Sequence, residues 1–273
     1  MKSEIVIYNL ATGAAETILL LDQHLEAPNW TPDGTALIVN GDGRLYRVDL
    51  SAPALATIET GFATQINNDH GVSPDGTTLV MSDSTEEGSS VIYTLPVKGG
   101  TPTRITPLAP SYWHGWSPDG ATLAYTAKRG ETFEIYTCPV HGGKERQVTF
   151  GFDHCDGPDY TTDGAWIWFN GERDARVCLW RVRPDGRDPE CMVADDRVNW
   201  FPHPSPDGKS VLYLAYEDGT QGHPSERQVE LRLVSAEGGR PQVLLELYGG
   251  QGTINVPCWA PDSQRFAFVR YHD

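Results

Sequence analysis

Basic residues are scarce in this sequence. Its 273 residues include 21 Lys and Arg against 37 Asp and Glu, which gives a formal net charge of −16. Nucleic acids and anionic membranes are recognised through basic surfaces. The charge balance therefore argues against both as partners, and it favours cations or neutral polar molecules as ligands.

Cysteine and long apolar stretches are also scarce. The five cysteines are odd in number and show no paired metal-ligand spacing, a pattern typical of reduced, mostly buried thiols in a cytosolic protein. Residues 1–8 begin a strand-like stretch at once and carry no signal-peptide core. No apolar run approaches the length of a membrane span. We therefore expect a cytoplasmic protein without a membrane partner.

The motifs of several large enzyme classes are missing. The sequence contains no Gly-x-Ser-x-Gly elbow, no Walker loop, no dinucleotide fingerprint and no His-Glu-x-x-His zinc helix. Any catalytic chemistry must come from another arrangement of residues.

A turn motif that recurs six times dominates the sequence. Proline presets φ, aspartate bonds back to the backbone, and glycine accepts a conformation that a Cβ would resist, so each copy predicts a strand, a tight turn and a second strand. The second positions of the six turns are 42, 44, 44, 44 and 55 residues apart. The copies are Thr31-Pro32-Asp33-Gly34, Ser73-Pro74-Asp75-Gly76, Ser117-Pro118-Asp119-Gly120, Thr161-Thr162-Asp163-Gly164, Ser205-Pro206-Asp207-Gly208 and Ala260-Pro261-Asp262-Ser263.

A period near 44 that contains only short strands indicates propeller blades. Residues 4–9 and 16–21 match the third and fourth strands of a blade, whereas residues 257–271 match a first and a second strand. Pairing the two termini would complete one blade and close the ring. We predict a single-domain, all-β, six-bladed propeller with four-stranded antiparallel blades. The blades are 26–67, 68–111, 112–155, 156–199, 200–254, and 255–273 joined to 1–25.

The later part of each repeat carries a family resemblance. An Ile-Tyr pair in the third strand and a closing Gly-Gly recur at Ile92-Tyr93, Ile135-Tyr136, Gly99-Gly100, Gly142-Gly143 and Gly238-Gly239. Together with the turns, they make the repeat resemble the TolB-like, WD-repeat-like propeller family over essentially the whole chain. The resemblance implies the fold and leaves the function open, because such propellers include binding proteins, peptidase domains and sugar lyases.

The starts of the six inner strands are the expected place for a site. In a propeller these strands line the central channel, and their starts share the face opposite the turns, so the turn aspartates are scaffold. Four of the eight histidines (His70, His114, His154 and His203) fall at this register. We predict that His70, His114 and His203 converge with Asp156, as acid–base groups or as ligands of a divalent metal. Alternatively, these polar residues hold only ordered water.

Other residues near the channel mouth are candidates for ligand contacts. Arginines that follow second strands could bind a carboxylate or a phosphate through paired hydrogen bonds from the guanidinium group, although such arginines are also a structural feature of the repeat. The polar loop 217–228 accounts for most of the longest interval and is either functional or an exposed insertion. The candidates are Glu26, Asn68, Asp69, Gln251 and Asn255 as polar groups, Tyr112, Trp113, Trp200 and Phe201 as an aromatic wall, and Arg129, Arg173 and Arg270.

Two functions follow from these features. The first is binding of, or action on, a small polar molecule such as a carbohydrate or sugar acid, with the oligogalacturonate-lyase branch of related propellers as a template for lyase- or isomerase-like chemistry with a histidine-bound metal. The second is a scaffold that binds a peptide or protein without catalysis, as in TolB. A closed, His-lined pocket would favour the first function, and an extended apolar patch around the mouth would favour the second.

Overall fold

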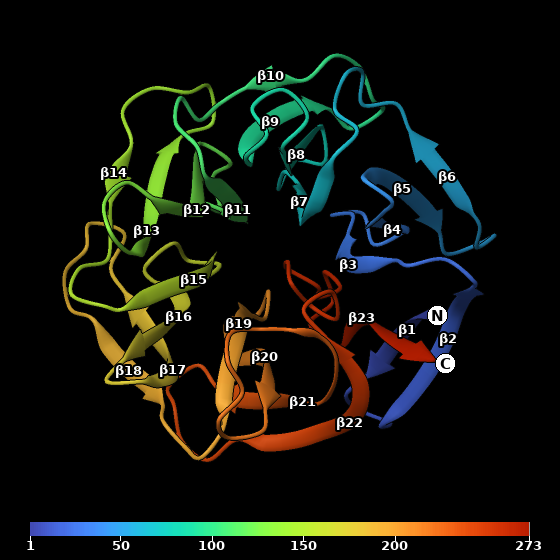
Figure 1. Cartoon of the computed structure of the whole chain (residues 1–273). Coiled ribbons are helices and arrows are strands. Elements are labelled where there is room, and N and C mark those ends of the chain that lie inside the picture. The colour runs from blue at the N-terminus through green and yellow to red at the C-terminus, as the bar shows by residue number, and fades with distance from the viewer. Residues whose placement is uncertain (273) are drawn as a thin grey trace.

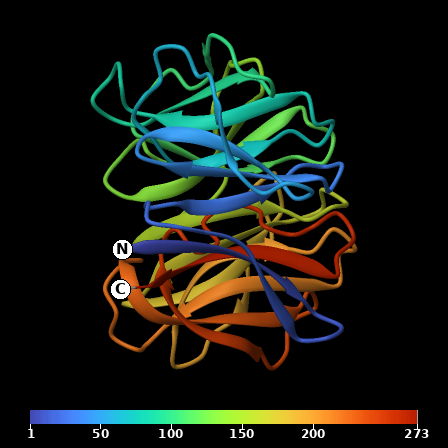
Figure 2. The ribbon, with the colours of Figure 1, turned by 90° about the vertical axis from the view of Figure 1, so that its right-hand side faces the viewer.

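The protein is a six-bladed β-propeller, as predicted (Figure 1). The computed structural model describes residues 1–272, and Asp273, assigned above to the sixth blade, lies outside this range. These 272 residues form no helix, and hence none that is long and apolar enough to cross a membrane. Seen from the side, the blades stack around the axis as a short, wide ring (Figure 2).

Five blades are regular four-stranded antiparallel sheets. Four of their inner strands begin one or two residues before the predicted blade boundaries. Blades one to three contain β3 (Glu26–Trp30), β4 (Ala36–Gly41), β5 (Arg44–Asp49) and β6 (Leu55–Ile58), then β7 (Ile66–Val72), β8 (Thr78–Asp83), β9 (Val91–Pro96) and β10 (Thr103–Arg104), then β11 (Ser111–Trp116), β12 (Thr122–Lys128), β13 (Phe133–Pro139) and β14 (Arg146–Gln147). Blades four and five contain β15 (His154–Tyr160), β16 (Ile167–Arg173), β17 (Arg176–Val182) and β18 (Glu190–Val193), then β19 (Val198–Pro204), β20 (Ser210–Tyr216), β21 (Ser225–Ser235) and β22 (Gln242–Gly250).

The second strands form the interior of the protein. Every residue of β4 is buried, and the middle five of β12 are buried as well. Because neighbouring blades cover both faces of each sheet, these strands read as continuous apolar runs without alternation. The largest buried side chains, among them Trp113, Trp168 and Tyr213, are fully enclosed.

The turn motif forms the hydrogen bonds that its residues predict. In the third blade, Ser117 Oγ donates to Asp119 Oδ1 at 2.6 Å, and the Ala121 amide donates to the same oxygen at 3.0 Å. Gly120 has a φ of +70°, which a side chain would resist. The same bonds recur at Asp33, Asp75, Asp163 and Asp207.

Successive turns also contact one another around the ring. A Cβ added to Gly76 would lie 3.9 Å from Pro32, and one added to Gly120 would lie 3.8 Å from Pro74. Where the fourth turn lacks its proline, Thr162 Oγ1 donates a 3.4 Å hydrogen bond to the next turn instead. Each turn therefore positions its neighbour, and the six turns form a continuous scaffold on one face.

The two termini share the sixth blade, as the sequence predicts. β1 (Lys2–Asn9) pairs with β2 (Ala14–Leu21) on one side and with β23 (Arg265–His272) on the other. Glu4, which is buried in β1, accepts hydrogen bonds from Arg270, Thr17 and His272, and chiefly the bond from Arg270 lowers the pKa of Glu4 to about 2. Figure 1 shows both ends of the chain in this blade.

The innermost part of the sixth blade departs from a regular strand. Its contact with β23 is reduced to a bridge between Trp259 and Phe266, flanked by backbone bonds. The preceding residues leave the sheet and run to the centre of the ring, where they appear in red beside β19 and β23 (Figure 1). As a result, these residues occupy part of the central channel.

Closure by β1 gives a first prediction. Deleting residues 1–10 removes the strand between β2 and β23 and leaves the edge of β23 unpaired, so we expect a protein that does not fold cooperatively. Thermal unfolding followed by circular dichroism checks this, with deletion of Met1 alone as the control. A truncated protein that stays soluble and melts near the wild-type temperature would contradict the closure.

Candidate functional site

A segment of the sixth blade, residues 251–258, fills the axis of the propeller and is held by side chains from other blades. His203 Nε2 donates to the Ile254 carbonyl at 2.6 Å, and His114 Nδ1 donates to the Asn255 carbonyl at 3.2 Å. Asn29 donates to the carbonyl of Pro257 at 2.7 Å. The inner strands therefore surround a peptide segment, and the space left for a ligand lies beside it.

Two of the three histidines predicted to converge instead form hydrogen bonds that belong to the fold. His70 is fully buried and donates from Nε2 to the carbonyl of Ile38 at 3.3 Å, and burial lowers its pKa to about 4. His203 is also fully buried, between Asp159 at 3.1 Å and the Ile254 carbonyl. Unlike His114, neither lines a cavity with Asp156. The predicted set of His70, His114 and His203 is therefore wrong as a common site.

The metal site predicted on those histidines is not formed. Across residues 1–272, no group of three or more His, Cys, Asp or Glu side chains is arranged to hold a metal ion. Both ring nitrogens of His203 and Nε2 of His70 already face backbone carbonyls or a carboxylate, whereas Nδ1 of His70 is buried without a partner among the described residues.

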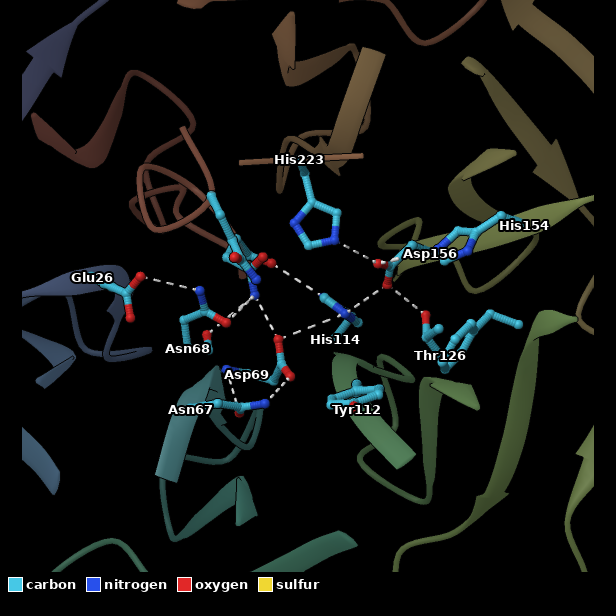
Figure 3. Close-up of a pocket in the computed structure, with 13 residues that line it drawn as sticks. Glu26, Asn67, Asn68, Asp69, Tyr112, His114, Thr126, His154, Asp156 and His223 are labelled. Carbon is cyan, nitrogen blue, oxygen red and sulfur yellow. Dashed lines mark hydrogen bonds and ion pairs between the residues drawn. The ribbon is translucent and has the colours of Figure 1, made fainter. Parts of the chain in front are cut away.

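A cavity of about 460 Å³ opens on the face where the inner strands begin, which is the predicted face (Figure 3). Blades one to four, the axial segment and the loop between β20 and β21 all contribute to it. Eight of its residues were predicted from sequence, namely Glu26, Asn68, Asp69, Tyr112, His114, Asp156, Gln251 and Asn255, and the others are Asn67, Thr126, Phe133, His154 and His223.

Backbone bulges aim these residues at the cavity. In each of the five regular inner strands, the pairing register shifts within the stretch that carries the site residues. Ala27, Gly157 and Phe201 adopt left-handed φ values of 53° to 60° at these bulges. A bulge breaks the alternation of inward and outward side chains and re-aims the residues beside it.

The predicted aromatic wall lies mostly behind the cavity. Trp113, Trp200 and Phe201 are at most 2 % exposed and do not line it. Trp200 and Phe201 pack against the ring of His223, at centroid distances of 4.4 and 5.4 Å. They therefore position a cavity residue and do not contact a ligand.

The three predicted arginines also lie elsewhere. Arg129 pairs with Glu145 at 2.6 Å, and Arg173 lies 4.2 Å over the ring of Phe152. Arg270 pairs with Glu4 in the closing blade. Each makes a structural contact, and the prediction that they bind a ligand is wrong for this cavity.

His223 is one of the cavity residues that sequence reasoning did not predict. It lies in the loop between β20 and β21, within the predicted loop 217–228, and Figure 3 shows its ring directed at Asp156. The extra length and polarity of this loop were the available signal, but they did not indicate which residue turns inward.

Asp156 is the centre of the cavity's polar groups. Its Oδ1 accepts from Thr126 Oγ1 and from the Gly157 amide, both at 2.8 Å, and forms an ion pair with His114 Nε2 at 3.1 Å. Its Oδ2 lies 3.6 Å from His223 Nε2 and 3.8 Å from His154 Nε2. One carboxylate thus connects the third, fourth and fifth blades.

The buried charges shift one another's pKa values. Burial disfavours a charged His114, but the neighbouring charges of Asp69 and Asp156 outweigh it and raise the pKa of His114 to about 9. Burial likewise opposes the charge on Asp156, yet His114 and His154 hold its pKa well below the usual range. Burial raises the pKa of Asp69 to about 6. At neutral pH the cavity therefore holds an imidazolium between two carboxylates.

Carboxamides fix the other end of the cavity. Asp69 accepts from Asn255 Nδ2 at 2.6 Å and from Asn67 Nδ2 at 2.7 Å. Glu26 accepts from Asn68 Nδ2 at 3.3 Å and from Asn40 Nδ2 at 3.1 Å. These bonds hold donors and acceptors in place before any ligand arrives.

His114 gives the protein a testable pH dependence. Its folded-state pKa of about 9 lies above the ordinary 6.5, so its stabilising contribution is complete below pH 6.5 and is lost as the pH rises through 9. We expect the free energy of unfolding to fall by on the order of 3 kcal/mol over this window, as measured by denaturant titration at several pH values. Asp69 titrates separately, between 3.8 and about 6.

The Asp156→Asn variant is the control for this effect. Without that negative charge the pKa of His114 should fall, and the loss of stability between pH 6.5 and 9 should shrink. A wild-type stability that is flat across this window would contradict the charged state assigned to His114.

Comparison with known proteins identifies relatives across the whole chain. The Agrobacterium fabrum protein Atu1656, whose name describes it as uncharacterized, is 45% identical over 272 residues, which cover 99% of this chain and 93% of that protein. A solved structure from Agrobacterium tumefaciens, provisionally assigned as TolB, superposes with a TM-score of 0.98 at 44% identity, covering 100% and 99% of the two chains. No model of a protein family matches the chain.

More distant structures share the fold alone. TolB from Acinetobacter baumannii matches with a TM-score of 0.72 at 20% identity, over 91% of this chain and 64% of that one. An oligogalacturonate lyase in complex with manganese matches at 0.59 and 16% identity, over 89% and 72%.

Fold and site together define a TolB-like six-bladed propeller with a polar cavity at its channel mouth. The chain belongs to the same TolB-like family as the Agrobacterium protein.

Proposed function

We propose that the protein binds a small, neutral, polyhydroxylated molecule, most directly a carbohydrate, in the cavity beside the axial segment. The observation that carries the proposal is the combination of fixed carboxylates and carboxamides with aromatic rings around one open cavity. Cavities of this size that combine apolar walls with a few fixed polar groups are typical of small-molecule sites.

The aromatic rings of the cavity offer surfaces for a sugar ring. Tyr112 and Phe133 lie 6.3 Å apart between ring centroids, and Phe133 lies 5.2 Å from the ring of His154. The apolar C–H face of a sugar would pack on these rings, while its hydroxyl groups would face the carboxylates and carboxamides opposite.

The charge of the lining favours a neutral ligand over a sugar acid. Three carboxylates, from Glu26, Asp69 and Asp156, line the cavity, and its lining contains no Lys or Arg. The positive charge of His114 is already shared by two of these carboxylates. These carboxylates would therefore repel an anionic ligand, and no guanidinium group is present to bind it.

The same groups supply acid–base chemistry for a bound sugar, in line with an isomerase- or lyase-like role. His114 holds a proton at neutral pH, whereas Asp69, with a pKa near 6, is poised to exchange one. Both line the cavity and would contact a ligand there.

Manganese is named in the lyase structure, but we propose no metal for this chain. The histidines predicted as ligands are divided between separate structural contacts, and no suitable donor group occurs within residues 1–272. We derive no step that passes through a metal.

A peptide-binding scaffold is the second candidate, because the family includes TolB, which is named as a Tol-Pal system protein. The large apolar residues exposed on the described part of the chain, Met1, Leu20, Leu108, Phe150 and Val243, do not line the cavity. This placement favours the small molecule.

The acidic charge and the free cysteines, with no disulfide within residues 1–272, support a cytoplasmic location without nucleic-acid or membrane partners.

A ligand screen tests the proposal. We expect neutral mono- and disaccharides to raise the melting temperature, with little effect from the corresponding sugar acids. In isothermal titration, Tyr112→Ala should weaken binding of the best sugar about tenfold, roughly 1.4 kcal/mol, because the sugar loses an aromatic surface.

The control lies on the opposite face. Asp119→Ala removes two turn hydrogen bonds, so it should lower the melting temperature and leave sugar affinity unchanged. Stabilisation by sugar acids alone, or by peptides and no sugar, would contradict the proposed function.

A further inference from the structure

We propose that the gap bounded by Asp156 Oδ2, His154 Nε2 and His223 Nε2 is the anchor for one hydroxyl group of the ligand. In this arrangement the loop between β20 and β21 supplies an essential part of the site. The inference rests on the proposed function and assigns one subsite within it.

The two oxygens of Asp156 have unequal surroundings. Oδ1 is engaged by Thr126, Gly157 and His114. The ring nitrogens of His223 and His154 come no closer to Oδ2 than 3.6 and 3.8 Å, which is beyond hydrogen-bond length. A buried carboxylate with an unengaged oxygen is costly unless another group completes it.

One of the two facing nitrogens also lacks a partner. Within the described chain, His154 Nε2 is buried and has no hydrogen-bond partner. Figure 3 shows the rings of His154 and His223 on two sides of the Asp156 carboxylate. Asp156 Oδ2 therefore faces two imidazole nitrogens, and neither is within hydrogen-bond distance of it.

A hydroxyl group has the bonding pattern that this space requires. It donates one hydrogen bond and accepts two, so it can donate to Oδ2 and accept from two imidazole N–H groups. An ammonium group donates three bonds and accepts none, and a metal ion needs the lone pairs of both rings. Although burial opposes it, the Asp156 carboxylate raises the pKa of His154, which favours a protonated ring. Burial lowers the pKa of His223, and a neutral His223 ring donates from Nε2 in the tautomer that carries its proton there.

His223 is held in place even though its loop is open to solvent. Its ring packs on Trp200 and Phe201, and the Tyr216 hydroxyl donates to the carbonyl of Pro224 at 3.0 Å, which fixes the end of the loop. Gly222, directly before it, has nothing within 4 Å of a Cβ position. The loop therefore presents a fixed imidazole on an exposed connection.

A sugar series separates this inference from the proposed function. The probes are the neutral monosaccharide that binds wild type best and its monodeoxy analogues, measured by isothermal titration. The variants are His223→Ala and, as matched control in the same loop, the exposed Gln221→Ala. We expect one deoxy position to cost at least tenfold in wild type and in Gln221→Ala, but less than threefold in His223→Ala.

The other outcomes are decisive. Wild-type affinity in His223→Ala, together with lost affinity in Tyr112→Ala, would overturn the hydroxyl anchor and leave the proposed function standing. Equal deoxy losses in both loop variants would also overturn it. Stabilisation of the wild type, but not of His223→Ala, by Mn²⁺ or Zn²⁺ alone would replace the hydroxyl with a metal. Absence of sugar binding to the wild type would reject both proposals.

Discussion

The central constraint in this protein is the burial of a peptide segment along the propeller axis. Segment 251–258 brings backbone carbonyls into the channel, where residues 253–256 are buried, and buried carbonyls need donors. Asn29, His114 and His203 supply them from the first, third and fifth blades. The closing blade is thereby tied to the rest of the ring at the centre as well as by strand pairing at its edge.

This constraint also explains the electrostatics of the cavity. His114 donates from one side to a carbonyl, so its other nitrogen faces Asp156 and Asp69. A carbonyl and a carboxylate both accept, which requires a proton on each nitrogen and makes the ring a cation. Buried carboxylates are tolerated where such a partner is fixed. The residue that holds the axis therefore also makes a carboxylate-lined cavity possible beside it.

The family relationship and the site address different questions. The Agrobacterium relatives share the whole chain and the fold, whereas the lyase shares only the fold, at 16% identity. Propellers host many unrelated functions, so the proposed ligand rests on the cavity residues of this chain. The residues that carry the proposal come from inner strands, a loop and the axial segment.

The sequence by itself determined the fold, because the turn chemistry of Ser-Pro-Asp-Gly is local and its period is visible along the chain. It also determined the closing blade and the face that bears the site, since both follow from the order of strands within a repeat. It indicated eight of the cavity residues, among them Asp156 and His114, by their position at the starts of inner strands.

Only the tertiary structure decided which of these side chains meet. Bulges re-aim the inner strands, so Trp200 and Phe201 turn away from the cavity although their register suggested a wall. His203 donates a hydrogen bond to the axial segment, and His70 donates one to the carbonyl of Ile38, so neither ring is free for the cavity. His223 enters from a loop. Bulges, channel filling and loop paths depend on contacts between blades far apart in sequence, and a repeat pattern carries no information about those contacts.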